Sequence, residues 1–276
     1  MNGILFALLG TLFTFAVTTI GACTIFLVKN EISSKLQCGF LGFAGGVMVA
    51  ASIWSLLLPG IKFAEDNGQI SWLIMTLGFV AGVITLLIAD AFIQKWYLKK
   101  QNGRSLPEQS SSNETTPQKS LPGKGVLMLT AAITMHNIPE GMSVGLAFAL
   151  AAQKPADSAL FIGACALALG IAIQNFPEGT AVALPLVKDG MPKRTAFFIG
   201  SMTAIVEPVF GVLAAVFASF AKTSIAGLLA FAAGTMIYVV VEELIPEAHT
   251  EKDDKSGTLG FVVGFLIMMI LDVALG

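Results

Sequence analysis

Eight long apolar runs divide this 276-residue chain, each about as long as a helix that crosses a lipid bilayer. Only 12% of the residues are charged, against roughly 25% in an ordinary soluble domain, so hydrated groups are too few to cover a compact soluble fold. The sequence therefore predicts an all-α polytopic membrane protein that forms a single transmembrane domain over residues 1–276. The eight predicted transmembrane helices are residues 3–28, 36–61, 70–97, 125–152, 158–187, 195–220, 223–246 and 257–275.

The basic residues predict how these helices are oriented. Thirteen of the 16 Lys and Arg residues lie in the odd-numbered loops or at the helix ends beside them. Cytoplasmic loops carry the excess of positive charge in membrane proteins, so both termini are expected on the extracellular or periplasmic side. The segment 99–124 is rich in Ser, Gln, Asn, Thr and Pro without an apolar period, which predicts a disordered cytoplasmic loop.

Acidic residues occur inside the predicted helices without basic partners. A charge at the bilayer centre costs ~2.5 to 3.5 kcal/mol, and no Lys or Arg lies within a span away from its ends to offset that cost. The compensating positive charge is therefore expected from metal ions or protons. For the four acids closer to span ends, the alternative is that they reach interfacial water. The acids near mid-span are Glu140, Glu178 and Glu207, and those closer to the ends are Asp90, Glu242, Glu243 and Asp272.

The fourth and fifth predicted helices repeat one motif. Residues 133–141 read ITMHNIPEG, and residues 171–179 read IAIQNFPEG. His136 and Glu140 are four residues apart, as are Gln174 and Glu178, so each pair shares one helical face and offers a cation two ligands. The proline inside each pair frees a backbone carbonyl, which lipid tolerates only if that carbonyl finds a partner or lines a cavity. The alternative is a pair of proline-kinked helices in which these side chains are hydrogen-bonded core residues.

Through these motifs the chain resembles the ZIP (Zrt-, Irt-like protein) family of divalent-metal transporters, prokaryotic type. The eight spans, the external termini and the long loop after the third span agree with that family. The resemblance implies a binuclear metal centre between helices 4 and 5, in which Glu140 and Glu178 bridge two sites. One implied site comprises Met48, His136, Glu140, Gln174 and Glu178, and the other comprises Asn137, Asn175, Glu207 and the two bridging acids.

Three further acids suggest a route through the membrane. Asp272 lies at the outer end of the eighth predicted helix, while Asp90 and Glu243 lie at the inner ends of the third and seventh. Glu247 and His249 follow just beyond and could receive the ion, although a solvated loop is the alternative for both. These residues are candidates for a pathway from the outside to the cytoplasm.

The predicted function is import of Zn²⁺ or a related divalent ion (Fe, Mn, Co or Cd) into the cytoplasm by alternating access to a midplane site. Imidazole and carboxylate ligands suit these metals. The expected location is the cell membrane, the inner membrane if the source is bacterial, and the expected partners are the metal and the lipid. A net charge of −2, with no basic cluster interleaved with aromatic residues, predicts no nucleic-acid partner. No prosthetic group is expected, and a homodimer is left open.

Two other functions remain as alternatives. An intramembrane metal-dependent hydrolase needs an open metal position and a general base, commonly presented as HExxH, which this chain lacks. A proton channel or proton-coupled cation carrier would use the acids but leaves unexplained why His136 and Gln174 each precede a Glu by four residues. The prediction is that the chain is a transporter and not an enzyme.

Overall fold

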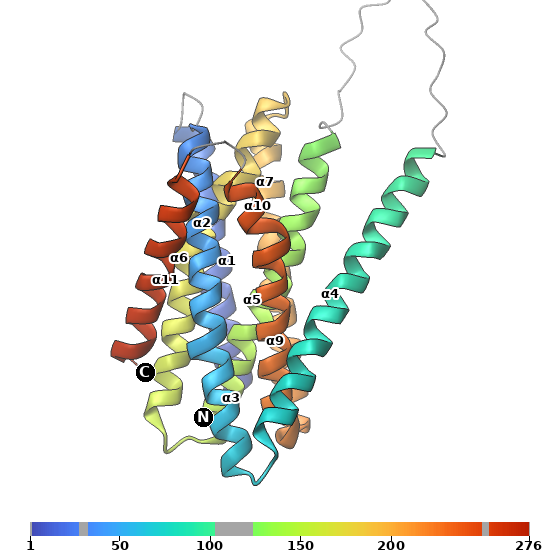
Figure 1. The fold of residues 1–276 in the computed structure, drawn as a ribbon. Helices are drawn as coiled ribbons and strands as arrows, with labels where there is room; N and C mark the ends of the chain where they lie inside the picture. The colour runs from blue at the N-terminus through green and yellow to red at the C-terminus, as the bar shows by residue number, and fades with distance from the viewer. Residues whose placement is uncertain (1, 28–32, 103–123, 250–253, 276) are drawn as a thin grey trace, which may run out of the picture.

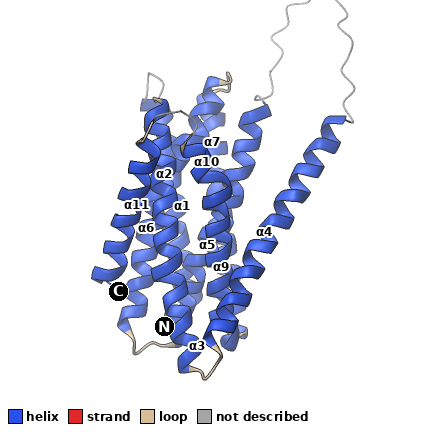
Figure 2. Cartoon of the chain, in the orientation of Figure 1, coloured by secondary structure: helices blue, strands red, loops and turns tan. Residues whose placement is uncertain are grey.

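The computed structural model describes residues 2–27, 33–102, 124–249 and 254–275, and the described part is helical with short connections (Figure 1). Figure 2 shows the same bundle with helices and loops only. Where one helix continues directly into the next, the described residues form eight rods, and both termini lie at one end of the bundle. The all-α prediction is confirmed. The rods are α1 (Gly3–Leu27); α2 (Ser34–Ala51), η1 (Ser52–Leu57) and α3 (Leu58–Asp66); α4 (Ser71–Asn102); α5 (Lys124–Gln153); α6 (Ser158–Lys188); α7 (Lys193–Met202), η2 (Thr203–Ile205) and α8 (Val206–Phe220); η3 (Lys222–Ser224), α9 (Ile225–Val239), η4 (Val240–Leu244) and α10 (Ile245–Ala248); and α11 (Ser256–Leu275).

The outer surface of the bundle is apolar, as expected of a multi-pass membrane protein. Trp72 is 70% exposed and Phe220 is 85% exposed, and many Leu, Ile and Val side chains are exposed as well. Seven of the rods are long and apolar enough to cross a bilayer, judged over the described residues alone. Helix α5 is not among the seven, and its centre carries the polar HNIPEG motif.

The helix ends follow local chemistry, and two of them differ from the prediction. Ser33 and Asp157 cap α2 and α6, because each side chain accepts a hydrogen bond from a backbone N–H of the first turn. The second rod extends to Asp66 rather than residue 61. Helix α4 continues to Asn102, into the segment predicted to be a loop, because the Leu, Lys and Gln residues there are good helix formers. The rest of that predicted loop, residues 103–123, lies outside the described residues.

Glycines let four pairs of helices pack backbone to backbone. The pairs are α2 with α11, α1 with α6, α4 with α9, and α5 with α8. At Gly42, for example, an added Cβ atom would collide with the carbonyl oxygen of Gly257 on α11. Small residues allow this approach, on which helix association in lipid depends. Helix α4 stands at the edge of the bundle and packs mainly against α9 (Figure 1).

Two rods contain a short stretch of π-helix, and each of these stretches ends shortly before a proline. Segment η1 precedes Pro59, and η4 precedes Pro246. Proline lacks the N–H and crowds the carbonyl four residues earlier, so the backbone widens locally to relieve the contact. Each π-helical stretch, called a wide turn below, carries a polar side chain that contacts a neighbouring helix. These side chains are Ser55 on η1 and Glu243 on η4.

Candidate metal centre

The two repeated motifs face each other across the contact between α5 and α6. His136, Asn137 and Glu140 project from α5 and are at least 95% buried. Gln174 on α6 is fully buried, and its Nε2 donates a hydrogen bond of 2.5 Å to Glu140 Oε1. Both helices run unbroken through the prolines of the motifs. The structure therefore brings the polar residues of the two motifs into one buried cluster.

Glu243 joins this cluster from η4, which sequence reasoning did not anticipate. Its Oε2 lies 2.5 Å from His136 Nε2, with both side chains largely shielded from solvent. The sequence placed Glu243 at an inner helix end and offered the buried acids no basic partner within the protein. At this position a histidine lies against the carboxylate, and the contact is an ion pair when His136 is protonated.

Glu207, at the start of α8, lies at the other side of the cluster and is completely buried. Its Oε1 accepts a hydrogen bond of 2.9 Å from Asn175 Nδ2, and its Oε2 accepts one from the hydroxyl of Thr14 on α1. Sequence reasoning did not single out Thr14. The available signal was a threonine face on the first helix, where Thr11, Thr14 and Thr18 recur at spacings of three and four residues.

Several buried oxygens of the cluster have no hydrogen-bond donor. Among the described residues of the two motifs, five side-chain oxygens are in this state: Asn137 Oδ1, Glu140 Oε2, Gln174 Oε1, Asn175 Oδ1 and Glu178 Oε1. A buried acceptor without a donor costs ~1 to 3 kcal/mol, and more if it is charged. These oxygen atoms have free lone pairs and lie on two helices that pack together, so they offer ligand atoms that a cation would satisfy.

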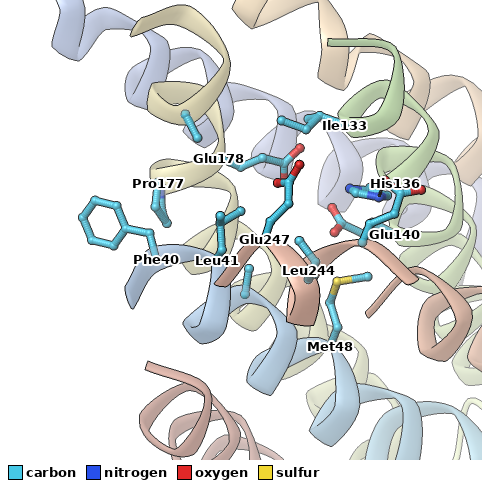
Figure 3. Close-up of a pocket in the computed structure, with 13 residues that line it drawn as sticks. Phe40, Leu41, Met48, Ile133, His136, Glu140, Pro177, Glu178, Leu244 and Glu247 are labelled. Atoms are coloured by element: carbon cyan, nitrogen blue, oxygen red, sulfur yellow. Dashed lines mark ion pairs between the residues drawn. The ribbon is translucent and has the colours of Figure 1, made fainter. Parts of the chain in front are cut away.

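A pocket opens onto this cluster between α2, α5, α6 and α10 (Figure 3). Glu178 on α6 and Glu247 on α10 point toward one another in it, and His136 and Glu140 lie beside them. Met48, which the family resemblance implies as a soft ligand, is 1% exposed and lines the pocket. The full lining is Phe40, Leu41, Ala44, Met48, Ile133, His136, Glu140, Pro177, Glu178, Ala181, Glu243, Leu244 and Glu247.

Amide side chains alternate with the acids of the cluster. Gln174 is hydrogen-bonded to Glu140, and Asn175 is hydrogen-bonded to Glu207. Among the described residues, no three His, Cys, Asp or Glu side chains form a group that could hold a metal ion by themselves. A cation held here would be shared between carboxylate, amide and imidazole ligands.

Two of the pathway candidates lie apart from the cluster. Asp272 is 8% exposed, accepts a hydrogen bond of 2.6 Å from Ser55, and lines a separate pocket with Lys62. Asp90 on α4 is half-buried and lies 3.4 Å from the Tyr238 hydroxyl. Neither acid lines the site pocket, so any role in the pathway is separate from metal binding at the cluster.

Two residues near the end of the seventh rod are exposed. Glu242 does not line the site pocket, although its neighbour Glu243 does. His249 contacts the Ile245 carbonyl oxygen at 2.9 Å and the Thr258 hydroxyl at 3.0 Å. Both positions fit the water-facing alternative for these side chains.

Comparison with known proteins identifies the family. A sequence model described as "ZIP Zinc transporter" matches residues 100–272. The zinc transporter ZIP11 of Homo sapiens is 34% identical, with 98% of this chain and 97% of that protein covered. The zinc transporter ZIPB of Bordetella bronchiseptica is 35% identical over 98% of this chain and 82% of its own length, and the zinc transporter GufA of Myxococcus xanthus is 31% identical with 98% of each chain covered. The chain belongs to the ZIP family of transporters.

Proposed function

We propose that this chain imports zinc into the cytoplasm through the cluster between α5 and α6. One observation carries the proposal: five buried oxygens of the repeated motifs lack a hydrogen-bond donor, and each of them is able to coordinate a cation. The relatives are named zinc transporters, which supports zinc as the cargo. Their names and the family also make the chain a transporter rather than an enzyme.

The ligand chemistry suits a borderline metal that must also be released. Imidazole and carboxylate bind Zn²⁺, and Fe, Mn, Co and Cd accept the same ligand types. His136, Glu140 and Glu178 would supply the strong ligands, with Met48 adding a soft one. The amide side chains of the two motifs are neutral and bind more weakly, which keeps the total charge around the ion moderate. In the binuclear form of the proposal, Glu140 and Glu178 bridge two ions, and the amides Asn137 and Asn175 with Glu207 complete the second site.

The pockets support alternating access. The site pocket shares Phe40 and Pro177 with a second pocket that reaches Lys188, at the end of α6 where the odd-numbered loops lie. The pocket at Asp272 faces the opposite end and shares no lining residue with the site pocket. With the odd-numbered loops in the cytoplasm, this arrangement is open inward and closed outward.

A packed layer separates the site pocket from the pocket at Asp272, which is called the outer pocket from here on. On α5, Val144 lies one turn from Glu140 of the site pocket and one turn from Ala147 of the outer pocket, and it is fully buried. On α6, Ile171 lies two turns from both Glu178 and Ala164, and it is equally buried. Outward opening in the proposed cycle requires these two side chains to move.

The proposal is tested by zinc uptake into proteoliposomes that contain purified protein and an internal zinc-sensitive dye. The wild type should accumulate zinc above empty liposomes. His136→Ala should abolish most of that uptake, because it removes the imidazole ligand and leaves Glu243 without its partner. Glu242→Gln is the matched control, since Glu242 is an exposed acid beside Glu243. Equal uptake by the wild type and His136→Ala would refute the proposed site.

A further inference from the structure

We propose that Thr14 is a positioning residue that holds Glu207 back from the metal and so keeps zinc affinity low enough for release. The inference rests on the proposed function, because it assigns a role to a side chain beside that same site. The three acids that the sequence places near mid-span have unequal surroundings.

Both carboxylate oxygens of Glu207 have a hydrogen-bond donor in this structure, whereas Glu140 and Glu178 each have an oxygen without one. Both of its carboxylate oxygens accept a hydrogen bond, one from Thr14 and one from Asn175. Glu140 and Glu178 each keep a buried oxygen without a donor. A cation entering the cluster therefore finds free lone pairs on Glu140 and Glu178, but it must compete with two donors for Glu207.

Thr14 can release Glu207 without leaving its own hydroxyl unpaired. Its Oγ1 lies near two acceptors, Glu207 Oε2 on α8 and the Thr11 carbonyl oxygen at 2.9 Å on its own helix. A hydroxyl carries one proton, so it donates to one acceptor at a time. When Glu207 turns toward a metal, the hydroxyl can donate to the Thr11 carbonyl instead, and when the metal leaves, it can bind Glu207 again.

Thr14 differs from the neighbouring threonines of the same helix face in that its hydroxyl contacts a carboxylate on another helix. Thr11 donates to the Ala7 carbonyl at 2.7 Å, and Thr18 donates to the Thr14 carbonyl at 3.2 Å. Both bonds remain within α1, although both side chains are as buried as Thr14. Thr11 therefore offers a matched control on the same helix face.

The consequence is a metal site whose affinity is lowered by a competing donor. A hydrogen bond to a charged group stabilises the metal-free carboxylate, and binding that uses this oxygen must give the bond up. Removal of the hydroxyl should therefore tighten zinc binding and slow zinc release. A residue needed only for packing would give no tighter binding when its hydroxyl is replaced by a methyl group.

The test is zinc titration of purified full-length protein in detergent, by competition with a chromogenic chelator. Thr14→Val should lower the Kd for zinc by about tenfold, the order expected for one hydrogen bond to a carboxylate. Thr14→Ser, which restores a hydroxyl, and Thr11→Val should both keep the wild-type Kd. In proteoliposomes Thr14→Val should lower KM and kcat together, because tighter binding delays release. In a Glu207→Gln background the same substitution should no longer tighten binding.

The outcomes separate the two proposals. A Thr14→Val protein that binds zinc with unchanged or weaker affinity overturns the role of Thr14, while wild-type uptake still supports the proposed function. A wild type that neither binds nor accumulates zinc overturns the proposed function itself. If Thr14→Val does not fold, Thr14→Ala carries the same expectation, because it also lacks the hydroxyl.

Discussion

Gly141, which ends the first repeated motif, should be intolerant of a methyl group. It packs directly on the backbone of Glu207, and an added Cβ would lie 2.3 Å from the Glu207 carbonyl oxygen and 2.5 Å from its Cα. Ordinary contacts begin near 3.4 Å, so Gly141→Ala must push α8 away by about 1 Å. Overpacking of this kind lowers the free energy of unfolding by ~1 to 3 kcal/mol. The higher helix propensity of Ala, compared with Gly, offsets at most ~1 kcal/mol of that loss.

The expected result is a protein destabilised by about 1 to 2 kcal/mol that transports poorly, because ligands must be held within ~0.5 Å of binding geometry. Thermal unfolding in detergent measures the first effect, and zinc uptake measures the second. Gly163→Ala on α6 is the control, since a Cβ there meets nothing within 4 Å. That variant should be as stable as the wild type or slightly more stable. A Gly141→Ala protein with wild-type unfolding and uptake would refute the close packing of α5 on α8.

Two more predictions concern residues around the site. Glu243→Gln should weaken zinc affinity by roughly 10- to 100-fold, the range for partners of a metal-binding histidine, whereas Glu242→Gln should have little effect in the same chelator titration. Asp272→Asn should raise the KM of uptake severalfold at low ionic strength with a smaller change in kcat, because it removes a buried negative charge from the outer pocket. Loss of that KM effect at high salt would agree with attraction of the ion, and no KM effect at any salt concentration would contradict it.

The helix pattern was readable from the sequence because lipid leaves the backbone few choices. A chain in lipid must satisfy its own backbone hydrogen bonds, so each long apolar run predicts one helix. Most helix ends in the described chain therefore lie within two residues of the predicted ones. The larger differences arise at the second rod, which continues through Pro59 to Asp66, and at α4, which continues to Asn102.

Helical spacing alone predicts the candidate site only where its residues share a helix. His136 and Glu140 are four residues apart, so their common face follows from helical geometry, and the same holds for Gln174 and Glu178. Which helices then meet depends on tertiary packing, which no local spacing encodes.

The partners supplied by other helices were missed for this reason. Glu243 reaches His136 through the wide turn of η4, and Thr14 reaches Glu207 from α1, at separations of more than 100 residues. Nothing in the local sequence around either residue indicates its partner.

The most direct test of the central claim is to locate zinc itself. Crystals of the zinc-loaded protein, measured above and below the zinc absorption edge, would place the ion by its anomalous signal. The expected peak lies between α5 and α6, about 2.0 to 2.2 Å from a nitrogen of His136 and a carboxylate oxygen of Glu140. A zinc peak found only elsewhere, such as beside Asp272, would contradict the assignment of the repeated motifs as the metal centre.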